Sequence, residues 1–306
     1  MATSISTTYA GEFAGKYISA ALLSGKTLGE ETITILPNIV HKQIMQKVSS
    51  NDIVKNGACD YSDSSTLTLS ERTLTLEDFM VNVTVCKKDF LNTWQAAEVG
   101  LGGLGRELPK SFADFVIGHF SAKVAQRMET NIWAGVNGTA GQFDGFKALL
   151  AADSDVVDVV ATDVNSGNVI QELGKVADAI PSQVFGQEDT TIWVATNVYR
   201  SYIRALGGFG ASGLGAAGYE DKGNNQAITP SFFDGIKISH AQGLGTNEMV
   251  AGQKSNFFFG TSLLNDLNEI KVIDMSDIDG SQNVRFIMRF QAGVQFGVGS
   301  DCVQYT

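Results

Sequence analysis

The sequence predicts an α+β fold with extended elements, and three patterns along the chain support this prediction. Residues 66–86 alternate polar and apolar side chains with a period of two, which is typical of strands that have one face on an apolar surface. Residues 111–134 repeat apolar side chains every three or four positions, as a long helix does. From residue 156 onward, helical and strand patterns mix, and strands dominate toward the C-terminus.

The alternating segment is expected to form a two-stranded hairpin. Its first run, residues 66–69, and its second run, which begins at residue 73, are separated by the polar residues Ser70, Glu71 and Arg72. Two alternating runs around a short polar break indicate a hairpin. An isolated two-stranded ribbon is marginal in water, so this one needs a neighbouring surface, either its own core or another subunit.

A long helix is expected next, after a short helix near residues 89–99 and a glycine-rich break. Ser111 has the character of an N-cap, with Asp114 three residues later at the spacing of a capping box. A helix that ends near Ala134 would be roughly 36 Å long at ~1.5 Å per residue.

The rest of the chain reads as an α/β region followed by strands. Ser166 and Asn197 are expected to cap two helices, with a short buried strand at residues 191–194 between them. A glycine-rich loop follows at residues 207–223. Further strands are expected at residues 236–239, 256–259, 270–273, 284–290 and 294–298.

The composition limits the kinds of partner and the cellular location that we expect for this protein. The formal net charge is −11, and Lys87-Lys88 is the only adjacent basic pair, so tight binding to nucleic acid is not expected. No apolar run approaches the ~20 residues that a membrane helix needs. The first ten residues carry no Lys or Arg, unlike the basic start of a signal peptide. The three Cys are far apart, which indicates reduced thiols.

Motifs for enzyme chemistry or metal binding are weak, and we expect no cofactor, no metal site and no catalytic residue. Gly208, Gly210 and Gly213 satisfy the dinucleotide-binding spacing, but they follow a predicted helix instead of a strand, so a flexible loop is expected. The acidic turn before Gly280 would place Met275 and Phe286 at the two anchoring ligand positions of a calcium loop, where neither can bind calcium.

The order of these elements resembles the major capsid proteins of tailed bacteriophages, which have the HK97-type fold. Residues 66–86 resemble the family's extended E-loop, and residues 111–134 its long spine helix. Residues 137–146, which read NGTAGQFDGF, resemble a glycine-rich turn after that helix. Residues 234–238 and 285–298 resemble the later strands of the fold.

The resemblance implies a division of the chain and a structural function without catalysis. The regions are an N-terminal arm (1–55), the E-loop (56–88), a peripheral P-domain with the spine helix (89–160), an axial α/β A-domain (161–262) and strands that return to the P-domain (263–306). The subunit would self-assemble into hexamers and pentamers of an icosahedral head around double-stranded DNA. It would contact that DNA only loosely, and no membrane is involved.

The resemblance also implies partners and a location. The arm-like region starts almost at Met1, so we expect a separate scaffolding protein as well as a portal. The protein would occur in the virion and, during assembly, in the host cytoplasm. The E-loop residues expected at the assembly interface are Leu67, Leu69, Glu71, Arg72, Leu74 and Leu76.

Two alternatives remain open at this stage. The first is an encapsulin, a shell protein of the same fold that packages an enzyme in place of a genome. The second and more distant one is a nucleotide-dependent enzyme that uses the glycine-rich loop after residue 207.

Overall fold

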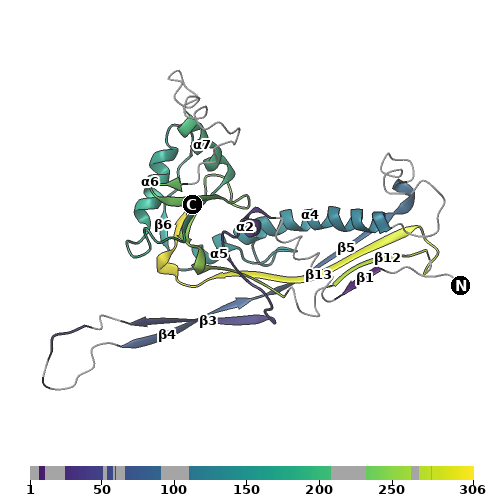
Figure 1. Cartoon of the computed structure of the whole chain (residues 1–306), viewed down its shortest axis with the longest axis horizontal. Coiled ribbons are helices and arrows are strands. Elements are labelled where there is room, and N and C mark those ends of the chain that lie inside the picture. The colour runs from purple at the N-terminus through teal and green to yellow at the C-terminus, as the bar shows by residue number, and fades with distance from the viewer. Residues whose placement is uncertain are drawn as a thin grey trace.

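The computed structural model describes residues 7–10, 25–50, 54–57, 59, 66–90, 110–207, 232–262, 269–276 and 278–306. Two six-stranded sheets and a separate two-stranded ribbon account for the strands in these ranges (Figure 1). Most of the expected helix at residues 89–99 and the glycine-rich loop after residue 207 lie outside the described residues.

The first sheet is organised around β13 (Asn283–Phe296), a strand of 14 residues. It pairs antiparallel with β12 (Glu269–Asp274), β11 (Phe257–Thr261) and β5 (Glu77–Cys86). The path through the sheet ends at β1 (Thr7–Ala10) and β2 (Thr34–Leu36), and β5, which pairs with β13 alone, is a further edge strand. The two strands expected at residues 284–290 and 294–298 are thus one strand, because the small residues Ala292 and Gly293 continue the pairing with β11.

A long helix, α4 (Lys110–Ala134), runs along this sheet (Figure 1). The prediction of a helix ending at Ala134 is confirmed, although the helix begins at Lys110, so that Ser111 lies within it and is not its N-cap. The ring of Phe120 packs 5.0 Å from that of Phe286 on β13. Near its end, the buried carboxyl of Glu129 accepts a 3.0 Å hydrogen bond from the backbone N–H of Thr27 in the short helix α2 (Lys26–Gly29).

The second sheet has the order β6-β14-β10-β7-β9-β8, with β6 at Val157–Val159, β14 at Val303–Tyr305, β10 at Met249–Gln253, β7 at Thr190–Val194, β9 at Ile236–His240 and β8 at Phe232–Phe233. Four strands, β6, β14, β7 and β9, run in the same direction. β6 is parallel to β14, and β7 is parallel to β9. β10 lies between these two pairs and is antiparallel to both β14 and β7.

Two helices accompany this sheet. They are α6 (Val169–Ala179), which follows β6, and α7 (Thr196–Gly207), which follows β7. The residue at the N-cap position of α6 is Asn168 instead of the expected Ser166, and Asn197 lies in the first turn of α7 instead of capping it. The short helix α5 (Phe146–Ala151) joins α4 to β6.

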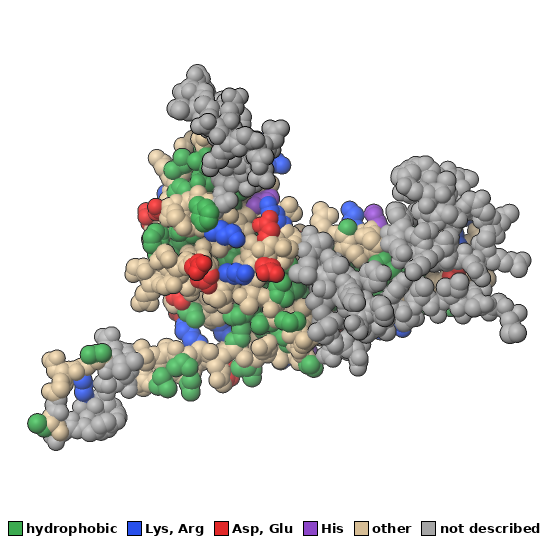
Figure 2. Space-filling model, in the orientation of Figure 1, with side chains coloured by type: hydrophobic (Ala, Val, Ile, Leu, Met, Phe, Trp, Pro, Cys, Tyr) green, Lys and Arg blue, Asp and Glu red, His purple; other side chains and the backbone are tan. Residues whose placement is uncertain are grey.

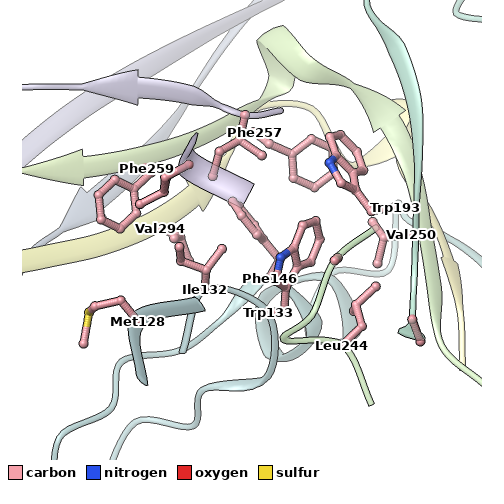
Figure 3. Packing of buried hydrophobic residues seen from close by; sticks show 14 of the residues in the cluster. Met128, Ile132, Trp133, Phe146, Trp193, Leu244, Val250, Phe257, Phe259 and Val294 are labelled. Atoms are coloured by element: carbon pink, nitrogen blue, oxygen red, sulfur yellow. The ribbon is translucent and has the colours of Figure 1, made fainter. Parts of the chain in front are cut away.

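Aromatic side chains connect the two sheets into one hydrophobic core. The rings of Trp133 on α4 and Trp193 on β7 lie 5.6 Å apart, and Phe257 on β11 packs 4.7 Å from Trp193 (Figure 3). Phe146 completes the group, with its ring 5.0 Å from Phe257. All four side chains are fully buried, so the α4 region and the α/β region pack against each other as one body.

The two-stranded ribbon projects from this body (Figure 1). It pairs β3 (Lys42–Ser50) with β4 (Leu67–Thr75) in antiparallel register, from Lys42 opposite Thr75 to Ser50 opposite Leu67. The predicted hairpin between residues 66–69 and the run after residue 73 is therefore wrong. Ser70, Glu71 and Arg72 continue one strand, and β5 leaves the ribbon to pair with β13.

Candidate assembly surface

The ribbon presents two faces of different character. Residues opposite each other in an antiparallel pair point to the same side, and side chains alternate along each strand. Even-numbered residues of β3 and odd-numbered residues of β4 therefore share one side, which we call the outer face. The remaining residues form the inner face, which approaches the body at the base of the ribbon.

The outer face carries a row of apolar side chains in solvent. Ile44, Val48, Leu67 and Leu69 expose 58, 59, 64 and 66 % of their surface, and Val48 lies directly opposite Leu69. Figure 2 shows hydrophobic side chains along the edge of the projecting ribbon. Exposed apolar patches of this kind are typical of surfaces that bind another molecule.

The inner face holds the ribbon to the body through Arg72. Its guanidinium forms an ion pair with Asp153, just after α5, and its Cζ atom lies 4.2 Å from the centre of the Phe296 ring. The hydrogen bond from Arg72 holds the pKa of the Asp153 carboxyl below its usual value, although burial opposes this. Arg72 is thus an intrachain anchor of the ribbon.

Leu74 and Leu76 are also turned toward the body. They are 0 and 3 % exposed and form a small second core with Ile39, which the partly buried Met45 covers. A Cβ atom on Gly260 would lie 2.7 Å from Leu74, so the absence of a side chain in β11 lets this cluster approach the sheet. We therefore correct their expected role: neither leucine is free to dock on a neighbouring subunit.

The remaining expected interface residue, Glu71, lies on the outer face and is exposed. Its Oε1 atom is 3.5 Å from Nε2 of Gln46, its cross-strand neighbour. Glu71 and Gln46 thus lie within the apolar row, between Ile44 on one side and the Val48–Leu69 pair on the other.

Sequence spacing contains the signal for this split. Leu67 and Leu69 are two residues apart, as are Leu74 and Leu76, but Leu69 and Leu74 are five apart. In one continuous strand an odd separation places two side chains on opposite faces. The leucines before residues 70–72 therefore lie on one face of the strand and those after them on the other, and the strand continues through these polar residues. Ile44 and Val48, which complete the apolar row, lie outside the segment that the alternation singled out.

Ionisable groups of the acidic turn make structural contacts. Asp274 of the acidic turn forms an ion pair with Lys87, so this lysine is held within the chain. Burial opposes ionisation of Asp274, but hydrogen bonds from Lys87 and Ser276 lower its pKa overall. Cys59, Cys86 and Cys302 are free thiols, as expected. Within the described ranges no cluster of potential metal ligands occurs, and no helix is long and apolar enough to cross a membrane.

No family model and no curated protein matches this sequence. Solved structures do match along nearly the whole chain. The capsid of an empty GTA particle has a TM-score of 0.58 at 10 % identity and covers 90 % of this chain and 94 % of its own. The satellite phage P4 procapsid matches with a TM-score of 0.56 at 9 % sequence identity, over 95 % of this chain and 97 % of the P4 chain. The capsid of Myoviridae phage XM1 matches with a TM-score of 0.56 at 13 % identity, over 92 % of each chain. The chain therefore has the HK97-type fold of these capsid structures.

Proposed function

We propose that this chain is the major capsid protein of a tailed bacteriophage. Copies of it would assemble into hexamers and pentamers of an icosahedral head that encloses double-stranded DNA. The observation that carries the proposal is the row of Ile44, Val48, Leu67 and Leu69, exposed on a ribbon that extends away from the body of a capsid fold.

The free energy gained by burying apolar side chains favours a role for this row in subunit association. Full burial of one aliphatic side chain contributes about 1.5–3 kcal/mol, so four of them supply a gross stabilisation of several kcal/mol per contact. Association entropy and side-chain ordering offset much of it. Weak contacts that are repeated around a closed shell suit such a subunit, which must stay soluble before assembly.

The ribbon suggests a revised division of the chain. We propose that the E-loop comprises β3 and β4, residues 42–75, and that β5 belongs with β13 to the P-domain. The A-domain would contain the second sheet with α6 and α7, and the chain returns to the P-domain through β12 and β13. A separate scaffolding protein and a portal would complete the assembly, and the mature subunit would reside in the virion.

The outer face of the ribbon can be tested by charge. Leu67→Asp/Leu69→Asp places two carboxylates in the apolar row, and we expect a folded subunit that forms no shells. Ser49→Asp/Thr68→Asp is the matched control, because these two exposed residues face each other on the inner side of the same part of the ribbon. The control should assemble as the wild type does.

Negative-stain electron microscopy and light scattering, with the scaffolding partner co-expressed, would measure assembly. Shells of normal yield from the double leucine variant would contradict the role of the outer face. The contents of wild-type particles distinguish the two shell functions: double-stranded DNA supports a phage head, and a packaged enzyme supports an encapsulin.

A further inference from the structure

A cavity of about 600 Å³ opens at one end of the second sheet. The loops that follow β6 and β9 line it together with α7, which follows β7, and these three strands are parallel, so the cavity lies at their carboxyl ends. Ligands of open α/β sheets bind in this position, outside the carboxyl ends of the strands. The ribbon does not line the cavity, so the cavity is independent of the surface described above.

Positive charge dominates the cavity wall. Arg200 and Arg204, one turn apart on α7, line it with Thr196 and Ser201, whereas no Asp or Glu does. Neither arginine forms an ion pair with a described residue. The N-terminal end of α7 adds the partial positive charge of a helix start. In a chain with net charge −11, two unpaired guanidinium groups on one wall indicate a site for an oxyanion.

A hydroxyl group in the cavity wall suits the same ligand chemistry. Ser201 lines the cavity, and its hydroxyl, which is accessible from the cavity, forms no hydrogen bond with a described residue. A carboxylate held by Arg200 and Arg204 could accept a hydrogen bond from it.

The walls of the cavity are fixed by side-chain amides. Oδ1 of Asn247 accepts hydrogen bonds from Nδ2 of Asn197 at 2.5 Å and from the backbone N–H of Val164 at 3.2 Å. Its Nδ2 donates to Asp163 at 3.0 Å. Asn247 adopts a left-handed φ of 62°, which this network maintains. The loops after β6 and β9 are thus joined to α7, and the site is preorganised.

His240 and Lys26 lie behind the cavity wall. Thr196 Oγ1 is 2.9 Å from Nε2 of His240, and Lys26 Nζ is 3.1 Å from Nδ1 of the same ring. Burial, together with the charges of Lys26 and Arg200, lowers the pKa of His240 and so favours the neutral imidazole. Lys26 itself pairs at 3.7 Å with Glu30. The positive charges of Lys26 and Arg200 therefore attract an anion without a contribution from a protonated His240.

We propose that this cavity binds an acidic side chain of a second copy of this chain. The inference rests on the proposed function, because neighbouring subunits of a ring meet through two different patches that must be complementary. Asp178 and Glu188 are exposed and form no ion pair with described residues. They lie near the C-terminal end of α6 and just before β7, at the amino end of that strand and opposite the cavity. A head-to-tail contact would bring these carboxylates to Arg200 and Arg204.

Nucleic-acid phosphate could use the same arginines, but the acidic chain as a whole disfavours it. A carboxylate of another copy is available at high local concentration in every ring.

Charge reversal tests the proposal. Arg200→Glu/Arg204→Glu should raise the subunit concentration for half-maximal assembly by roughly tenfold or more. Adding Asp178→Arg/Glu188→Arg to the same chain should restore assembly, because every contact then regains opposite charges. Lys123→Glu/Arg127→Glu is the control, since these exposed residues of α4 have the same spacing and change the net charge equally. The control should assemble normally.

Mass photometry of capsomers and shells, with the scaffolding partner present, would measure these effects. Equal assembly of the wild type and Arg200→Glu/Arg204→Glu would overturn the proposal. The proposal would also be overturned if the variant with all four substitutions did not regain assembly. Binding of a fluorescent oligonucleotide that is lost in Arg200→Glu/Arg204→Glu, with assembly unchanged, would assign the cavity to phosphate instead. A wild type that forms no particles would count against the proposed function itself.

Discussion

Single polar residues connect distant segments of this fold, and Thr27 does so at the end of α4. Its hydroxyl accepts a 2.8 Å hydrogen bond from Nε1 of Trp133 and donates one to Glu129, while its backbone N–H donates to the same carboxyl. Burial raises the pKa of Glu129, and the hydrogen bonds from Thr27 counteract part of that rise. Thr27 therefore satisfies two groups that would otherwise be buried without partners.

We expect Thr27→Val to lower the free energy of unfolding by about 2–3 kcal/mol, because it leaves a buried indole N–H and a carboxyl oxygen without their partner. Thr27→Ser keeps the hydroxyl and serves as the control, with a much smaller loss. Urea denaturation of the unassembled subunit would measure both. Equal stability of the two variants would show that the hydroxyl is unimportant.

The Arg72–Asp153 pair at the base of the ribbon predicts a dependence on pH. Because the folded-state pKa of Asp153 lies below the ordinary value of 3.8, the pair stabilises the fold above that value. This contribution is lost as the pH falls through the lower, folded-state pKa. We expect Asp153→Asn to cost about 1–2 kcal/mol at pH 7, and the difference from the wild type to shrink below about pH 4.

Denaturation curves of the wild type and Asp153→Asn between pH 7 and pH 3 would check this. A difference that stays constant down to the lowest pH would argue that ionisation of Asp153 contributes nothing to stability.

At the scale of the element, the two halves of β4 lie in different environments. Its first half directs Leu67 and Leu69 to the outer face, and its second half directs Leu74 into the second core. The polar residues between them make this division possible, because they shift the apolar side chains to the other face of an unbroken strand. One strand thus both exposes apolar side chains on the ribbon and attaches the ribbon to the body.

The division predicts opposite effects for two leucine truncations. Leu74→Ala should destabilise the subunit by about 2–3 kcal/mol, since it opens a cavity in a small core. Leu69→Ala should change stability by less than about 0.5 kcal/mol, as exposed substitutions do, and should weaken assembly instead. Thermal denaturation and particle yield, measured for both variants, separate the effects. A strongly destabilised Leu69→Ala would show that the outer face is covered within the subunit.

At the scale of the whole molecule, the described part of the subunit is extended. The ribbon and the long strands of the first sheet reach away from the core that joins the two sheets (Figure 1). We therefore expect the subunit to be more extended in solution than a compact protein of its length.

Small-angle X-ray scattering of an assembly-defective subunit tests this outline. A compact chain of this length has a radius of gyration of about 19 Å, and we expect a clearly larger value with a long tail in the distance distribution. Leu67→Asp/Leu69→Asp is suitable for the measurement because it should remain unassembled. A value near that of a sphere would mean that the ribbon folds back on the body in solution.

The sequence by itself determined the local elements of this protein. The repeat of Val116, Val124, Met128 and Ile132 specified α4, and alternation around Phe286 and Met288 specified much of β13, since local periodicity decides which face of an element is apolar. The order of these elements was sufficient to anticipate the fold. The spacing also places Leu67 and Leu69 on the face opposite to that of Leu74.

Only the tertiary structure decided which strand pairs with which. Nothing local in residues 66–86 indicates that β4 pairs with β3 while β5 pairs with β13, because partners are chosen by contacts far apart in the chain. The same holds for the burial of Leu74 beneath Ile39 and for the meeting of Arg200 and Arg204 with two distant loops. Periodicity fixes the faces of an element, but only packing determines what each face meets.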